Sequence, residues 1–209
     1  MVNNIALKRF LAFIFDFLLI SVIVSMFGEL KVINPYYDEY INISEEYITY
    51  VESIEDVNDI DSNVVNTFVY KISYYSLYNN IIFVVFIVIY YIVFQFFNDG
   101  KTIGKALMRI KIASNNGKKV SFFQILIRTL IINGLLFNCI NVICLILMSE
   151  KSYINIVSLI QLVDMLIFVI CVLMILFRKD GKGLHDIVSN SKIVVEKNVT
   201  FVDKSVNND

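Results

Sequence analysis

The chain has 209 residues, of which 57% are hydrophobic and 18% are charged, with one proline and a mean hydropathy of +0.70. This composition excludes an ordinary water-soluble domain and indicates a membrane protein. The formal net charge of −1 averages acidic and basic segments, and we expect no nucleic-acid partner. The three cysteines fall within apolar stretches at spacings that match no metal site, so we expect neither a metal nor a cofactor.

Four apolar stretches are long enough, at about 20 residues each, to cross a bilayer as helices. They are predicted at about 10–27, 80–97, 122–148 and 154–177. A cleaved signal peptide is the alternative for the first stretch, but Asp16 interrupts it and no small-residue cleavage site follows. Only residues 149–153 separate the last two stretches, which predicts an antiparallel helical hairpin.

The distribution of lysine and arginine predicts the orientation of these helices. The N-terminus, the segment between the second and third stretches and the C-terminal tail hold 15 of the 18 basic residues. Both termini and the central loop are therefore predicted to be cytoplasmic, in a multi-pass protein of the cell membrane. The basic central loop would meet the anionic lipids of the inner leaflet.

Residues 29–75 form an acidic loop with ten carboxylates, predicted to lie outside the cell. Such a cluster either collects cations near a mouth or is simply a solvated surface segment. The spacing of a calcium-binding loop is missing, which favours the second interpretation.

The central segment 98–112 contains two Gly-Lys pairs, but neither has the spacing of a phosphate-binding loop. Residues 109–113 alternate polar and apolar side chains, 114–117 read Ser-Asn-Asn-Gly, and 118–121 continue the chain. This pattern predicts a short β-hairpin. The expected fold is an all-α membrane protein: a four-transmembrane-helix bundle with both termini cytoplasmic and a short cytoplasmic β-hairpin between helices two and three.

Four ordered motifs resemble the RDD-domain family of membrane proteins: Arg9 to Asp16, Lys-Thr-Ile-Gly-Lys at 101–105, the Asn-Asn-Gly turn followed by Arg128, and Gly-Leu-His-Asp at 183–186 before an apolar strand. The family is named for one arginine and two aspartates, which carry over to Arg9, Asp16 and Asp186. The resemblance implies one membrane domain over 6–196, which includes the acidic loop, followed by a polar tail at 197–209. Cation/proton antiport is suggested for some members of the family.

Ionisable side chains inside apolar spans indicate functional sites. Asp16 and Arg128 each lie six residues inside their spans, about 9 Å from the same edge. This predicts an ion pair between helices one and three, which serves either as a packing lock or as an ion or proton site. Arg9 is expected to reach the inner interface instead.

Asp164 lies about 21 Å from the end of the fourth stretch, and no basic side chain in any span matches that depth. A neutral carboxyl hydrogen-bonded to Asn133, Asn138 or Asn141 is expected. Such a group either joins two helices or serves proton coupling.

His185 and Asp186 precede the final apolar strand. An acid–base pair is one interpretation, but adjacent residues do not face each other and no nucleophile motif lies nearby. Asp186 is instead expected to cap the next segment or to pair with Arg9. We therefore expect no catalytic residues and no enzyme.

Two functions remain. The first is a small ion or proton-coupled transporter, homo-oligomeric because four helices enclose little pore. The second is a non-transporting membrane scaffold or interaction protein. The candidate ion-pair or coupling residues are Arg9, Asp16, Arg128, Asp164 and Asp186. Transport predicts an inward cavity lined by Asp16 and Asp164, whereas a scaffold predicts both carboxyls sealed and satisfied.

Overall fold

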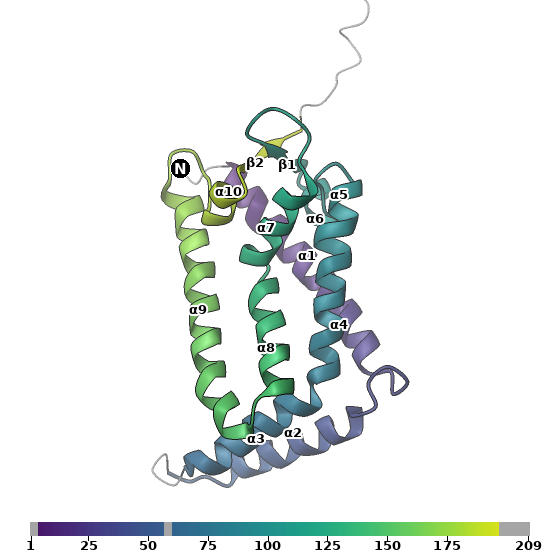
Figure 1. Ribbon diagram of the computed structural model, residues 1–209, viewed down its shortest axis with the longest axis vertical. Helices are drawn as coiled ribbons and strands as arrows, with labels where there is room; N and C mark the ends of the chain where they lie inside the picture. The colour runs from purple at the N-terminus through teal and green to yellow at the C-terminus, as the bar shows by residue number, and fades with distance from the viewer. Residues whose placement is uncertain (1–3, 57–59, 197–209) are drawn as a thin grey trace, which may run out of the picture.

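A computed structural model of the chain describes residues 4–56 and 60–196, so the predicted polar tail at 197–209 lies outside the described residues. Long helices form a bundle with a two-stranded sheet at one end (Figure 1). Two further helices lie across the opposite end. These two ends are called the sheet end and the α2–α3 end below.

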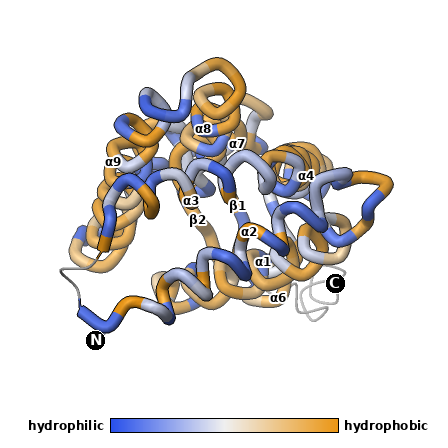
Figure 2. The backbone as a smooth tube through the Cα atoms, turned by 90° about the horizontal axis from the view of Figure 1, so that it is seen from below, coloured by the Kyte–Doolittle hydropathy of each residue, from blue (hydrophilic) through white to orange (hydrophobic). Residues whose placement is uncertain are grey.

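Three segments are long and apolar enough to cross a membrane: α1 (Asn4–Gly28), the stretch Leu77–Phe97, and α9 (Glu150–Phe177). The stretch Leu77–Phe97 runs through α4 (Leu77–Ile87), the π-helix η2 (Val88–Phe94) and α5 (Gln95–Phe97). Figure 2 shows apolar residues along most of their lengths. The first, second and fourth predicted helices therefore exist, and each begins a few residues earlier than expected.

The third predicted helix is broken. It consists of α7 (Phe122–Ile132) and α8 (Leu135–Leu147), which meet at an angle of 65°. Gly134 has a φ of 63°, the left-handed conformation that glycine adopts easily and that commonly ends a helix. The expectation of one continuous helix over 122–148 was wrong, because apolar residues continue on both sides of this glycine. The bundle has three candidate spans, or four if the bent pair is one.

The predicted helical hairpin is present, because α8 and α9 run antiparallel and are joined directly at residues 148–149 (Figure 1). The buried side chains of Cys144, Leu145, Tyr153 and Val157 pack between them. A second cluster joins α1, the second span and α8 through Ile20, Ile87, Tyr91, Ile92 and Leu135.

The predicted local β-hairpin was wrong. The strand β1 (Ile110–Ser114) pairs antiparallel with β2 (Ser191–Val195), so its partner comes from the C-terminal end of the domain. The turn at 114–117 does form, but residues 118–121 then lead into α7, whose N-terminus is closed by a capping box between Ser121 and Gln124. Ile112 and Ile193 lie opposite each other in the sheet, and both pack against Val120 and Ile125.

The acidic segment folds into α2 (Tyr37–Glu52) and α3 (Ser62–Tyr75), which lie side by side across the end of the bundle (Figure 1). Asp61 caps α3 by accepting a hydrogen bond from the backbone of Asn63. The ring of Tyr70 contacts that of Tyr153 in α9 at 5.8 Å, which attaches this pair of helices to the spans.

Two short helices complete the sheet end. The helix α6 (Ile103–Leu107) packs on α1, and α10 (Leu184–Val188) packs on α7 and α9. Both bring backbone and polar side chains against the buried charges of the spans.

Candidate functional site

A carboxylate shared by two arginines lies where α1, α7 and α10 meet. Asp186 is fully buried, and its Oδ2 accepts a hydrogen bond of 2.6 Å from Arg9. Its Oδ1 accepts a short hydrogen bond from Arg128, which also donates to Ser191 Oγ at 2.7 Å. The backbone N–H of Gly183 donates to Asp186 Oδ2 at 2.9 Å. Both expected roles of Asp186, capping its segment and pairing with Arg9, are confirmed.

The charge state of this cluster follows from its partners. Burial alone would raise the pKa of Asp186, but the neighbouring positive charges, Arg128 and Arg9 among them, outweigh it and hold the pKa below its usual value. Asp186 is therefore ionised and binds two cations, which is the arrangement in which a buried carboxylate is most strongly held.

His185 orients Arg9. Its Nε2 lies 3.0 Å from Arg9 Nη2, and because a guanidinium can only donate, Nε2 is the acceptor and the ring proton resides on Nδ1. Among the described residues, Nδ1 is buried without a hydrogen-bond partner. Burial lowers the pKa of His185 well below its usual value, so the imidazole is neutral.

Asp16 holds α6 against α1. Its carboxylate is almost fully buried and accepts hydrogen bonds from Tyr90 Oη at 2.5 Å, Thr102 Oγ1 at 2.5 Å and the backbone N–H of Gly104 at 2.7 Å. Thr102 also caps α6, since its Oγ1 accepts from the backbone N–H of Lys105. A Cβ on Gly104 would clash with the carbonyl oxygen of Ala12, so only glycine allows this approach.

The predicted ion pair between Asp16 and Arg128 is therefore wrong. Both side chains are buried toward the sheet end, but each has another partner. The reason is that α6 and α10, which lie outside the spans, fold back and supply those partners. Depth within a helix does not reveal such segments.

A family model described as the RDD family matches residues 5–190. This chain belongs to the RDD family. No curated protein and no solved structure gives a significant match. Of the three residues that the resemblance relates to the family's name, Arg9 and Asp186 are in direct contact, whereas Asp16 binds a separate set of groups.

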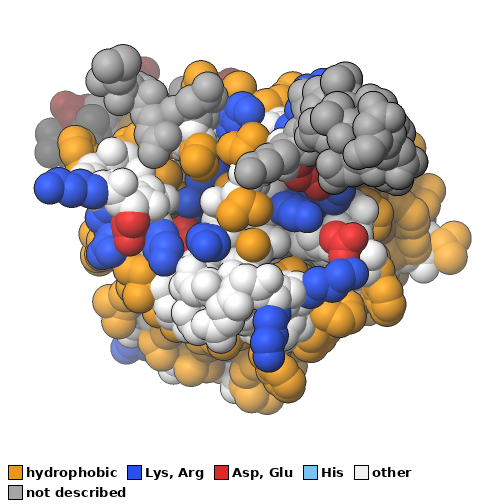
Figure 3. All heavy atoms as spheres, turned by 90° about the horizontal axis from the view of Figure 1, so that it is seen from above, with side chains coloured by type: hydrophobic (Ala, Val, Ile, Leu, Met, Phe, Trp, Pro, Cys, Tyr) orange, Lys and Arg blue, Asp and Glu red, His pale blue; other side chains and the backbone are white. Residues whose placement is uncertain are grey.

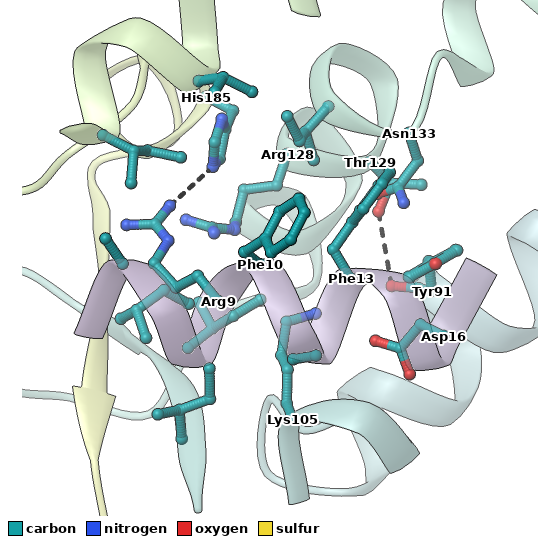
Figure 4. A pocket seen from close by; sticks show the side chains of 18 of the residues that line it. Arg9, Phe10, Phe13, Asp16, Tyr91, Lys105, Arg128, Thr129, Asn133 and His185 are labelled. Carbon is teal, nitrogen blue, oxygen red and sulfur yellow. Dashed lines mark hydrogen bonds between the residues drawn. The ribbon is translucent and has the colours of Figure 1, made fainter. Parts of the chain in front are cut away.

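The charged groups of this RDD protein surround a cavity of about 420 Å³. Arg9 from α1, Arg128 from α7 and Lys105 from α6 converge on it, as Figure 4 shows. Asp16, Tyr91 and His185 also line it. Its remaining lining consists of the polar side chains of Gln95, Thr129 and Asn133 and of apolar side chains of α1, α7, α9 and the sheet. This cavity is called the basic cavity below.

A second cavity of about 320 Å³ lies among the four predicted spans. Its polar lining comes from Asn133, Gly134, Asn138, Gln161 and Asp164. It is called the midspan cavity below. The two cavities share wall residues at the break of the third span: Phe13, Tyr91, Ile132, Asn133 and Phe168.

Asp164 lies beside the broken helix. A Cβ on Gly134 would lie 3.3 Å from Asp164 Oδ2, which places the carboxyl against the first residues of α8. Asn133 and Asn138 line the same cavity, but Asn138 donates to the carbonyl of Gly134 and no hydrogen bond to Asp164 occurs in the part of the chain that the structure describes. The expected asparagine bond is absent there. Asn141, the third candidate, accepts from Tyr153 instead.

Sequence reasoning missed five residues of the site: Tyr90, Thr102, Gly104, Lys105 and Ser191. Three of them belong to the Lys-Thr-Ile-Gly-Lys motif, which carried the resemblance and was considered only as a phosphate loop. Its threonine and glycine are the signal that could have identified donors to the carboxylate of Asp16. Tyr90 lies in the π-helix, and such irregular turns are frequent at functional sites.

Proposed function

We propose that this RDD-family protein is a multi-pass membrane transport protein for a proton or a small cation. The observation that carries the proposal is the contact between two cavities at a broken span: the basic cavity at the sheet end adjoins the midspan cavity, with Tyr91 and Asn133 in both walls. Broken helices of this kind form ion sites in transporters, because they leave backbone groups free at membrane depth.

Asp164 is the coupling carboxylate in this proposal. It is half-exposed in the midspan cavity, and it makes no hydrogen bond or ion pair within the described residues. A carboxyl in this setting can exchange a proton or bind a cation without first breaking an internal bond. Gln161 and Asn138 offer amide oxygens nearby, which suit a small cation.

The other buried charges form the frame around this path. Asp16 already accepts three hydrogen bonds, and Asp186 accepts from both Arg9 and Arg128. We propose that they fix α6 and α10 at the mouth of the basic cavity. Coupling then rests on Asp164, rather than on all five charged candidates.

The sheet end is cytoplasmic in this proposal, because basic residues are concentrated in the segments that build it. Figure 3 shows Lys and Arg side chains spread over that face. It would lie against the anionic inner leaflet of a cell membrane. We also propose a homo-oligomer, since four helices enclose little pore.

Flux measurements in proteoliposomes test the proposal. The purified full chain is reconstituted, and Na⁺, K⁺ and pH gradients are imposed in turn. The wild type is expected to dissipate at least one gradient, and Asp164→Asn is expected to slow that flux by about tenfold or more. Asp180→Asn, an exposed carboxylate that pairs with Arg178, is the matched control. A folded wild type that moves none of these ions favours the alternative, a non-transporting scaffold.

A further inference from the structure

The basic cavity contains cationic donors that the protein itself does not use. Arg128 donates to Asp186 and Ser191 through Nη1 alone, so Nη2 and Nε have no partner among the described residues. Lys105 Nζ likewise makes no hydrogen bond or ion pair within 4–56 and 60–196. Its contact is the face of the Tyr91 ring, 5.8 Å from the ring centroid.

The charge around the cavity is positive. Arg9, Arg128 and Lys105 face it with two carboxylates nearby, and His185 is neutral. Asp186 neutralises part of the positive charge of Arg9 and Arg128, because one carboxylate is shared by two guanidinium groups. Asp16 already accepts three hydrogen bonds from neutral donors. An unpaired ammonium beside partly used guanidinium groups, in a site of low polarity, favours an anion.

Apart from Gln95, Thr129 and Asn133, the rest of the cavity is apolar, and it opens toward the side of the bundle. Leu7 and Phe10 of α1 are 51% and 59% exposed, and Phe168 and Leu176 of α9 are 38% and 51% exposed. All four line the cavity. Phe13 and Phe168, with ring centroids 5.8 Å apart, close the gap between α1 and α9 on the side of the midspan cavity. An occupant therefore meets charge at one end and apolar side chains that face lipid at the other.

We propose that the basic cavity binds one anionic membrane lipid, whose phosphate headgroup reaches Lys105 and Arg128 and whose acyl chain leaves between α1 and α9. The volume of about 420 Å³ lies within the ordinary range of ligand pockets. A soluble phosphate would use the same donors, but it would leave the apolar half of the cavity unfilled. The proposed lipid site lies in the cavity beside the coupling site, and its test measures binding rather than transport.

Thermal unfolding of the purified full chain in neutral detergent tests this proposal. A thiol-reactive dye reports unfolding, because Cys144 and Cys171 are buried. Four probes are compared: phosphatidylglycerol, phosphatidylcholine, diacylglycerol and soluble glycerol 3-phosphate. Phosphatidylglycerol is expected to raise the melting temperature of the wild type in a saturable manner, and the other three are expected to have much smaller effects.

Two matched variants locate the binding. Lys105→Gln is expected to weaken the effect of phosphatidylglycerol by about tenfold or more in concentration. Lys119→Gln removes an exposed lysine of the same face and is expected to leave it unchanged. If Lys105→Gln does not fold, Val172→Trp, which adds bulk to the apolar wall, is expected to weaken binding instead.

Three results would overturn the proposal. Equal protection by phosphatidylcholine would mean that charge is not recognised, and equal protection by glycerol 3-phosphate would identify a soluble anion as the ligand. Unchanged binding in a folded Lys105→Gln variant would place the lipid elsewhere on the protein. If Lys105→Gln does not fold, unchanged binding in Val172→Trp would lead to the same conclusion.

Discussion

Arg9 and Asp186 lie 177 positions apart in the chain and are joined by an ion pair of 2.6 Å, in which the carboxylate is fully buried and the Arg9 side chain is 10% exposed. This pair connects the beginning of the first span to a short helix that follows the last one. Arg128 binds the other oxygen of the same carboxylate, so a single side chain connects three separate segments of the bundle. Because Arg9 and Arg128 share the Asp186 carboxylate, its removal would leave both guanidinium groups without their counter-charge.

Replacing Asp186 with asparagine is expected to destabilise the protein by about 3–5 kcal/mol, because two buried guanidinium groups would then face each other without a counter-charge. The free energy of unfolding in mixed micelles measures this loss. Asp180→Asn, which removes an exposed carboxylate paired with Arg178, is expected to change little. An equal effect of the two substitutions would contradict the assigned role of Asp186.

The pH dependence of stability should reveal His185. Its folded-state pKa lies well below 6.5, so below pH 6.5 the unfolded chain takes up a proton that the folded chain does not. Stability should therefore fall with decreasing pH, by up to about 1.4 kcal/mol per pH unit from this residue. His185→Gln, which keeps an acceptor for Arg9, should reduce that slope between pH 6.5 and 5. His185 is the only histidine in the chain. If the stability of the wild type and of the variant fell equally steeply with decreasing pH, His185 would not be a buried neutral imidazole.

Much of the architecture could be predicted from sequence, because length and apolar composition determine which helices can cross a membrane. The positions of three spans and the short turn before α9 followed from that physics. The partners of the buried charges could not be predicted in this way, because α6 and α10 are helices of only five residues and have no apolar periodicity to mark them. The pairing of Asp186 with Arg9 was predictable only because two terminal motifs were considered together.

The two wrong predictions of secondary structure have a common cause. Local patterns predicted a hairpin at 109–121 and a continuous helix at 122–148, and both were decided by distant contacts. The strand β1 has a better apolar partner in β2, through Ile112 and Ile193. The break at Gly134 brings that glycine beside Asp164 of another helix. A single sequence shows neither relationship.

Gly104→Ala is expected to be strongly destabilising, because the new methyl group would meet the backbone carbonyl of Ala12 and lie 2.8 Å from Asp16 Oδ1. The helix α6 must then move away, and Asp16 loses donors while it is still buried. We expect a loss of about 2–4 kcal/mol in micelle unfolding experiments. Gly117→Asn is the control, since open space surrounds that glycine and asparagine tolerates its positive φ. Comparable losses in both variants would argue against close packing of α6 on α1.

Disulfide formation tests the origin of the second strand. Lys111 and Val194 lie opposite each other in the sheet, so cysteines at these positions should crosslink readily under mild oxidation. Cysteines at 111 and 120, which a local hairpin with its turn at 114–117 would place opposite each other, should crosslink poorly. Both pairs are compared in a background without the three native cysteines, with mobility on denaturing gels as the measurement. Preferential crosslinking of 111 with 120 would support the local hairpin instead.

Lys105 should affect stability at alkaline pH. Burial lowers its pKa to about 8, against an unperturbed value of 10.5. Between these values the unfolded chain holds a proton that the folded chain has released, so stability should rise as the pH increases from about 8 to 10.5. Asp16, Arg128, Arg9 and Asp186 surround the ammonium and have opposing effects on it.

Lys105→Met is expected to remove this rise while keeping the apolar part of the side chain. Melting temperatures of the two proteins are compared across that pH range, and Lys119→Met serves as the exposed control. Other lysines and tyrosines titrate in both proteins, so the difference between their curves isolates Lys105. Bound anionic lipid would raise the pKa of this ammonium, so the rise should begin at a higher pH when phosphatidylglycerol is present. Parallel curves for wild type and Lys105→Met would mean that the lysine is solvated rather than directed into the basic cavity.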